Sequence, residues 1–517
     1  MDRPWAQVPL KREQALLFGQ TLDEAVAREH PIRVLDVLLY QLDWQEWEAQ
    51  YAGRRGQPPI HPRYVAGAIL YGIMRGVRSS RELEDATRER IDFRWFLEGQ
   101  TIDHSTFAEF RTRFGKPLKQ LNRQLARLIC ARFEQSLLTL VLDGTRIRAN
   151  SDRHGTRTEQ GLERLISACV RELDAKLAGL GQVDEHDAAA VRQIGELNAR
   201  ISTLEAQIAQ YRKALAVAKV RGAKKRQKKG ARASAVSVPV TDPDATLAPN
   251  KEGGFAPNYT PTVAVDAASR AIVYDDVQPG SDEAGAVLPA VAEARSLGAH
   301  APQSVLADTS FASDKNLREL EANHIEACMP TGTDFSAGNP ANRPDPTLPV
   351  PADQYKSLPL RDKRLAHRAF IYDPVHDRYH CPMGTVLAFE GACRDRRNGE
   401  TNRHYACPGR DGCPLADRCA KAGDSARTII RHPGQDLRDR IGRRMATPDG
   451  QALYNKRAPV VEGTFAHIKH IMGVRRFLLR GLDKVRTEWS WVCTGYNLKR
   501  LLRLVLQNGV GRPAMQG

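Results

Sequence analysis

Apolar residues gather in two short runs, and an aspartate follows each run directly. The first run covers residues 137–142 and precedes Asp143, and the second covers 305–307 and precedes Asp308. Largely apolar runs of this length are typical of buried strands. Residues at the carboxyl ends of strands in an α/β sheet face one crevice, so we expect the two aspartates to lie close together. Taken alone, the pair Asp143-Gly144 is more typical of an ordinary turn.

A third β-rich region, residues 259–274, has two apolar runs around a polar turn. This pattern predicts a hairpin that supplies two further strands of the sheet. Asp266 lies at the turn, where aspartate is common for conformational reasons, so it is the weaker candidate for a functional acid. Asp242 and Asp244, in Thr-Asp-Pro-Asp, are interpreted as turn residues for the same reason.

Near the C-terminal end, apolar residues recur at a spacing of three to four. They are Val461, Phe465, Ile468 and Met472. The spacing predicts an amphipathic helix with one buried face. Glu462 and Lys469 are about two helical turns apart and share a neighbouring face, and Tyr454 and Arg457 precede them. An acid bracketed by cations suits a metal-and-phosphate site, and the alternative is a surface helix with ordinary charge pairs.

Asp143, Asp308 and Glu462 together offer only oxygen atoms as ligands. Hard divalent cations prefer such a set, so the residue types favour Mg²⁺ or Mn²⁺ over zinc. The order of the three acids along the chain, two after strands and one on a late helix, is harder to dismiss than any one of them alone.

These motifs resemble those of the DDE transposases of bacterial insertion sequences. Asp143-Gly-Thr and Ala307-Asp308 match the first two acids of that family, and the third acid matches within its Tyr-Arg-Glu-Lys signature. The signature residues are Tyr454, Arg457, Glu462 and Lys469, and the match continues through 475–481 and Asn497-Leu498. Two departures are the four residues between Arg457 and Glu462, where three are usual, and Thr309-Ser310-Phe311, where the family more often has Gly and Tyr.

The resemblance implies a fold and a chemistry. The fold class is α/β, with an RNase H-like mixed sheet flanked by helices. Asp143, Asp308 and Glu462 are expected to hold two Mg²⁺ (or Mn²⁺) ions, and Lys469, Arg457 and Tyr454 are expected to contact DNA. The implied reaction nicks double-stranded DNA at terminal inverted repeats and joins the 3′-hydroxyl to target DNA, within a homodimer or higher assembly. The alternatives are a metal-dependent nuclease without strand transfer and an inactive DNA-binding regulator.

The remaining patterns divide the chain. Residues 1–130 are expected to form an all-α domain for DNA-end binding or dimerisation, with capping-box spacing at Ser79/Glu82 and Thr106/Glu109. The catalytic sheet is expected in 131–160, 255–335 and 445–510. The pattern in residues 161–254 predicts a helical hairpin or short coiled coil, followed by a basic linker. Residues 219–232 of this linker are expected to form a mobile loop that is attracted to the phosphates of DNA. A Pro-rich linker and a Cys-rich insertion occupy 336–440.

The Cys-rich insertion contains four cysteines in Gly/Pro-rich turns: Cys381, Cys407, Cys413 and Cys419. Four thiolates are the ligand set of a structural zinc. The gaps of five residues between the last three exceed the usual knuckle spacing, and His380, Cys393 and His404 offer competing ligands. Structural zinc and reduced, non-ligating cysteines therefore both remain open.

Charge and composition agree with a polyanionic partner. The chain has 517 residues and a formal net charge of +16, which favours nucleic acid. The number of cysteines, nine, is odd, and we see no export signal, so we expect no disulfide framework. We also see no apolar run long enough for a membrane span. We expect a soluble cytoplasmic protein associated with the bacterial nucleoid.

Overall fold

The computed structural model describes residues 21–51, 58–180, 188–229, 234–249, 254–278, 283–298, 300–395, 399–420 and 426–507. Its architecture is mixed α/β, and the chain divides into two compact units. One unit combines residues up to 125 with those from 490 onward, and the other spans 126–489. None of the described helices is both long and apolar enough to cross a membrane.

The regular elements described in the first unit are helices. Its elements are α1 (Pro31–Tyr40), α2 (Gln45–Glu48), α3 (Pro62–Met74), α4 (Ser80–Glu89), α5 (Ile91–Phe96), α6 (His104–Arg113), most of α7 (Gly115–Cys130) and the later part of α16 (Leu482–Gln507). The capping box at Ser79 and Glu82 is confirmed. The box expected at Thr106 is wrong, because Asp103 caps α6 by accepting the Thr106 N–H at 2.8 Å.

Aromatic side chains form the centre of this helical unit. Trp47 stacks on Phe114 with ring centroids 4.9 Å apart, and it also meets Phe110 and Trp491. Aromatic pairs at these distances add to the free energy of burial. Because Trp491 lies on α16, the C-terminal helix completes the core that the early helices begin.

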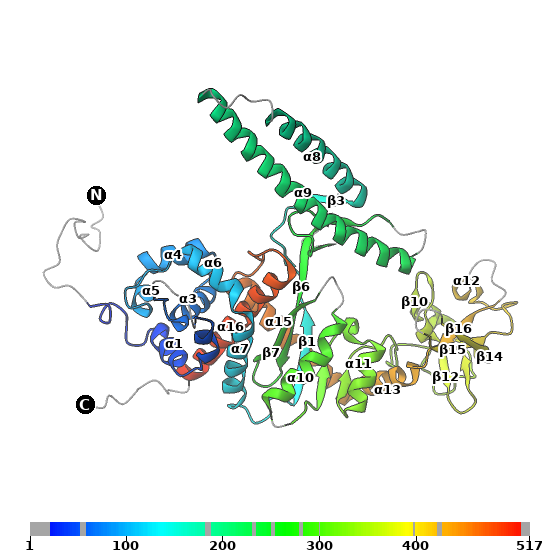
Figure 1. Ribbon diagram of the computed structural model, residues 1–517. Helices are drawn as coiled ribbons and strands as arrows, with labels where there is room; N and C mark the ends of the chain where they lie inside the picture. The colour runs from blue at the N-terminus through cyan, green and yellow to red at the C-terminus, as the bar shows by residue number, and fades with distance from the viewer. Residues whose placement is uncertain are drawn as a thin grey trace, which may run out of the picture. The chain divides into compact units, whose positions relative to one another are not determined.

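The second unit contains the main sheet (Figure 1). Its strands run in the order β7-β6-β1-β8-β9, and the short strands β2 (Ile147–Arg148) and β5 (Thr246–Pro249) pair with the early part of β6. The bounds are β1 (Thr139–Gly144), β6 (Phe255–Asp266), β7 (Ile272–Gln278), β8 (Ser304–Leu306) and β9 (Glu326–Cys328). The predicted strands and the hairpin at 259–274 are thus confirmed.

Strand direction decides which residues share an edge of this sheet. β6 is antiparallel to both β1 and β7, whereas β8 and β9 are parallel to β1. β1, β7 and β8 therefore end at one edge, and β6 ends at the opposite edge. Helices α10 (Val287–Leu297) and α11 (Asp314–Ala322) lie beside the sheet (Figure 1).

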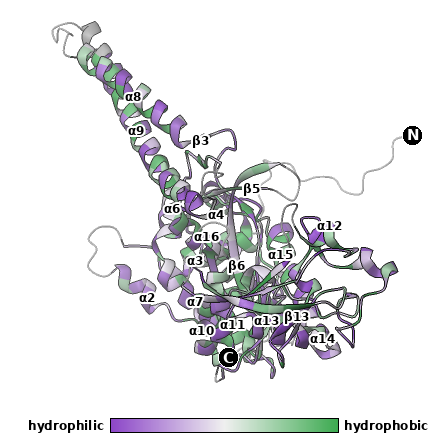
Figure 2. Ribbon diagram, turned by 90° about the vertical axis from the view of Figure 1, so that its right-hand side faces the viewer, coloured by the Kyte–Doolittle hydropathy of each residue, from purple (hydrophilic) through white to green (hydrophobic). Residues whose placement is uncertain are grey.

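Two long helices, α8 (Glu159–Leu180) and α9 (Ala188–Lys229), pack against each other. Arg200 of α9 bonds Glu172 of α8 at 2.6 Å, and hydrophilic and hydrophobic residues alternate along both helices (Figure 2). The loop expected from Lys219 onward is wrong as far as Lys229, because α9 continues to that residue. Arg221 supports this extension by donating to the carbonyls of Asp244 and Ala245. Residues 230–232 of the expected loop lie outside the described residues.

A smaller five-stranded antiparallel sheet follows. Its strands are β12 (Ile371–Asp373), β13 (Arg378–His380), β14 (Val386–Arg394), β15 (Thr401–Ala406) and β16 (Thr428–Arg431). Its core includes Tyr379, Tyr405 and Leu387, and it also takes in Ala341 and Val350 from the Pro-rich segment. That segment is therefore packed at these positions and is not simply a linker.

Candidate active site

Asp143 and Asp308 lie at the edge where β1 and β8 end. Asp143 is still within β1, paired with Val263, so the alternative of an ordinary turn at Asp143-Gly144 is wrong. Asp308 follows β8 and accepts the Ser310 N–H at 2.8 Å, which caps a short 3₁₀ turn. The pKa of Asp143 is raised, chiefly because the carboxyl is buried, and the charge of Asp308 raises it further.

Arg457 connects the two aspartates. Its guanidinium lies 2.9 Å from Asp143 Oδ1 and 4.0 Å from Asp308 Oδ2. The residue begins α15 (Arg457–Ala466), which packs against β1. Its Nε atom is buried and has no hydrogen-bond partner among the described residues. A cation thus already lies between the two carboxylates.

Glu283 is a third acid at this edge, and no sequence pattern singles it out. Its Oε2 accepts the Ser310 hydroxyl at 2.8 Å, and the same hydroxyl lies 2.6 Å from Asp308 Oδ1. Its Oε1 occupies the space that a Cβ on Gly144 would take. The pKa of Glu283 is raised, first by burial and then by the charges of Asp308 and Asp143.

Glu283→Gln is expected to stabilise the fold in neutral solution. A carboxyl with a raised folded-state pKa contributes stability below its unfolded pKa and loses it as the pH rises through the folded value. Glutamine keeps an acceptor for Ser310 and carries no charge, so the gain is absent near pH 4 and emerges towards pH 8. Partial exposure and solvent screening keep it below about 1 kcal/mol. Urea unfolding of both proteins across this pH range measures the difference, and a gain that is equal at every pH contradicts it.

Lys469 reaches the residues that follow Asp143. Its Nζ donates to Thr145 Oγ1 at 2.5 Å and to the Arg146 carbonyl at 3.1 Å. Lys469 does not continue the α-helix that carries Glu462, because a π-helical turn, His467–Ile471, follows α15. The predicted helix thus continues through Lys469, but its last turn is π-helical and not α-helical.

Glu462 is exposed on α15, whereas Asp143 is half-buried and contacts Arg457. Among the described residues, no three His, Cys, Asp or Glu side chains are grouped so that they hold a metal ion. The structure thus joins Asp143 and Asp308 through Arg457 and does not add Glu462 to that pair. The burial pattern of α15 and the turn after it is as expected, with Val461, Phe465 and Ile468 buried.

Tyr454, on α14 (Pro448–Asn455), lies in the same neighbourhood. Burial raises the pKa of its phenol, the guanidinium of Arg457 lowers it, and the charges of Asp308 and Asp143 raise it again. Tyr454, Arg457 and the two aspartates therefore act on one another electrostatically.

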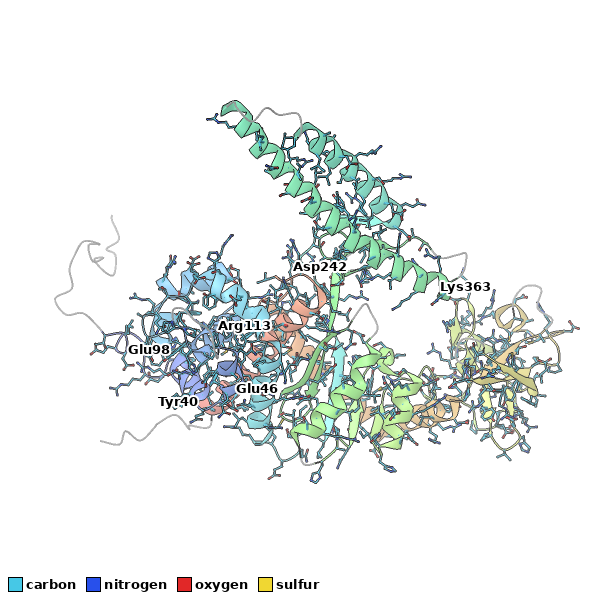
Figure 3. The ribbon with its side chains drawn as sticks, viewed as in Figure 1. Tyr40, Glu46, Glu98, Arg113, Asp242 and Lys363 are labelled. Atoms are coloured by element: carbon cyan, nitrogen blue, oxygen red, sulfur yellow. The ribbon has the colours of Figure 1, made fainter. Side chains whose placement is uncertain are left out.

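The rival aspartates have structural roles. Asp266 is buried and accepts from Ser136 Oγ, Leu137 N and Ser269 N at 2.7–2.8 Å, at the opposite edge of the sheet from Asp143. Asp242 (labelled in Figure 3) accepts from Tyr259 and Gly481. Asp244 accepts the Leu482 N–H at the start of α16. These contacts agree with the interpretation of the three aspartates as turn residues, and Asp244 in addition accepts from the start of α16.

Two parts of the sequence match known protein families. Residues 380–502 match a family model described as a transposase DDE domain, and residues 20–113 match one described as a transposase domain (DUF772). Together they support a DDE transposase of an insertion element. The first match includes Tyr454, Arg457, Glu462 and Lys469, whereas Asp143 and Asp308 lie outside both matched ranges. No curated protein and no solved structure matches the chain.

Proposed function

We propose that this chain binds the terminal inverted repeats of its element, nicks the DNA there and joins the freed 3′-hydroxyl to target DNA. The observation that carries the proposal is the pairing of Asp143 and Asp308 across the Arg457 guanidinium, at the strand ends of a mixed sheet. The two transposase matches supply the reaction class, and a DDE domain implies dependence on a divalent metal. We assign the catalytic unit an RNase H-like fold on the same grounds.

The aspartate pair fits a hard divalent cation. Its donors are carboxylate oxygens, and a positive guanidinium already stabilises them at 2.9 and 4.0 Å. We propose Asp143, Asp308 and Glu462 as the ligands of two Mg²⁺ or Mn²⁺ ions. When bound, such ions supply an activated oxygen nucleophile and neutralise charge on the leaving oxygen. Glu462 then has to approach the pair in the complex with DNA, as catalytic geometry often tightens only with substrate present.

The remaining side chains bind and orient DNA in this proposal. Arg457 lies beside the acids with its guanidinium on Asp143 and Asp308, and in the complex with DNA it would turn from them to bind a phosphate bidentately. Lys469 fixes the backbone after Asp143 and adds a positive charge. Tyr454 lies near enough to both aspartates to contact the scissile strand or a displaced base. The helical N-terminal domain is proposed to recognise the ends, and a dimer or higher assembly to hold both ends together.

Lys469→Gln is expected to slow cleavage by about 10- to 100-fold, because a small displacement of reacting groups has an effect of this size. Binding to end DNA should change little, since one phosphate contact contributes a small part of the total. Rates from labelled ends, measured beside binding by gel shift, test this. Lys484→Gln, an exposed lysine at the start of α16, is the matched control. Equal cleavage by both variants contradicts the assigned role.

The proposal is tested by incubating the full chain with its flanking DNA ends and a target duplex, in Mg²⁺ or EDTA. Metal-dependent nicks at the element boundary, followed by joined products, support transposition. Nicks without joining select the metal-dependent nuclease, and binding without nicks selects the inactive regulator. The proposed site of action is the nucleoid in the bacterial cytoplasm.

A further inference from the structure

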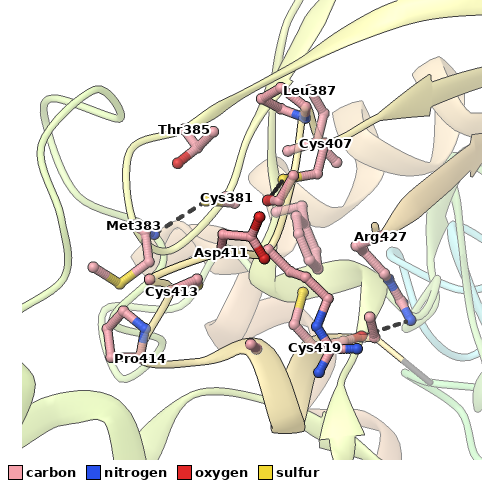
Figure 4. A pocket seen from close by; sticks show the side chains of 17 residues that line it. Cys381, Met383, Thr385, Leu387, Cys407, Asp411, Cys413, Pro414, Cys419 and Arg427 are labelled. Carbon is pink, nitrogen blue, oxygen red and sulfur yellow. Dashed lines mark hydrogen bonds between the residues drawn. The ribbon is translucent and has the colours of Figure 1, made fainter. Parts of the chain in front are cut away.

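Four cysteines of the small antiparallel sheet line one pocket of about 530 Å³. They are Cys381, Cys407, Cys413 and Cys419, and Figure 4 shows them on the pocket wall. Cys381 comes from the turn after β13, while the other three follow β15, so the fold gathers them from separate segments. All four pack against the same apolar core, and none forms a disulfide.

The turn at Cys381-Pro-Met-Gly384 already has the form of a ligand-bearing turn. The Met383 N–H donates to Cys381 Sγ at 3.2 Å, and the Gly384 N–H donates to the Cys381 carbonyl at 2.9 Å. Gly384 has φ +79°, a conformation that favours glycine. The turn therefore holds the sulfur in a fixed position beside a backbone N–H, as a ligand-bearing turn requires.

Two of the other sulfur-bearing residues have defined local surroundings. Cys407 Sγ donates to the Gly409 carbonyl at 3.1 Å, within its own turn, and Cys419 ends the short helix α12 (Ala416–Cys419). As placed, the four sulfurs do not form a metal-holding group, and Cys407 has to rotate away from Gly409 to join one.

We propose that Cys381, Cys407, Cys413 and Cys419 bind one structural zinc ion as a tetrathiolate. A dication removes the mutual repulsion of the thiolates and replaces the S–H bond to Gly409 with a Zn–S bond, releasing the thiol protons to solvent. The rotation would take place within the pocket that the four cysteines line. Zinc would tie the Cys381 turn to the segment after β15 and stabilise a sheet whose own core is small. This site is separate in chemistry from the oxygen ligands at Asp143 and Asp308, and it does not depend on the proposed reaction.

The test is metal analysis of the full-length protein purified under reducing conditions without added chelator. We expect about one zinc per chain, retained after dialysis. Cys413→Ser should lower the zinc content at least several-fold. Cys393→Ser is the matched control, because Cys393 is exposed on β14 and does not line the pocket. Zinc content unchanged in Cys413→Ser, or lost equally in Cys393→Ser, overturns the proposal.

A second measurement uses only the wild-type protein, so it tests the site even if Cys413→Ser fails to fold. Wild-type protein loaded with Co²⁺ should show the intense near-ultraviolet thiolate-to-metal absorption and visible bands of a tetrahedral thiolate site. Co²⁺ bound only by carboxylates gives no thiolate absorption, so the aspartate pair cannot imitate the result. Reduced wild-type protein that contains no zinc and develops no thiolate absorption with cobalt refutes the site.

Discussion

Asp143→Asn is expected to reduce cleavage at the element ends by at least about a thousand-fold, while binding to those ends is retained. Asparagine keeps the shape of the side chain and an oxygen that can accept from Arg457, which lies 2.9 Å away. It removes the negative charge that a divalent cation requires. Asp308→Asn should behave in the same way, because its carboxylate faces the same guanidinium. Single-turnover cleavage and gel-shift binding, measured on the same preparations, separate the two effects.

The matched control for both variants is Asp449→Asn. Asp449 is exposed in the first turn of α14, near Tyr454 in sequence and outside the aspartate pair. It should cleave at the wild-type rate. Cleavage by Asp143→Asn within ten-fold of the wild type would remove Asp143 from the site.

Glu462→Gln is expected to abolish cleavage to a similar extent, again with end binding intact. This expectation comes from the family signature. The structure itself places Glu462 on an exposed face of α15. Since that side chain is exposed, its replacement should leave the free energy of unfolding within about 0.5 kcal/mol of the wild type. A loss of activity without a loss of stability therefore indicates a ligand that joins Asp143 and Asp308 only with DNA and metal present.

Glu319→Gln, an exposed glutamate on α11, is the control for Glu462. Glu283→Gln provides a second comparison, because Glu283 already contacts Ser310 beside Asp308. If Glu462→Gln cleaves normally and Glu283→Gln does not, the third acid is Glu283, and the signature glutamate has another role.

The sequence predicts β1, β8 and the hairpin because their signals are local. An apolar run before Asp143 or Asp308 is complete within a few residues, and it fixes the strand and its end. Asp266 illustrates the limit of that signal. Its position after a strand is similar, but β6 runs in the opposite direction, so it lies at the other edge and binds Ser136 and Leu137. Strand direction, and not composition, separates these aspartates.

The position of Glu283 follows from strand direction in the same way, although its sequence pattern does not predict it. β7 is parallel to β1, so a residue soon after Gln278 reaches the edge where Asp143 lies. No apolar run ends directly at Glu283, however. The direction of β7 in the sheet is known only from its antiparallel pairing with β6. The π-helical turn at His467–Ile471 has no comparable sequence signal, because one wider turn leaves the apolar spacing nearly unchanged.

Gly144 has a consequence for the whole edge of the sheet. A methyl group there would meet the carboxylate end of Glu283, whose other oxygen accepts from Ser310 beside Asp308. The missing side chain thus preserves a bridge between two acids from distant segments. The absence of a side chain at Gly144 therefore allows the Glu283 carboxylate to lie next to Asp143.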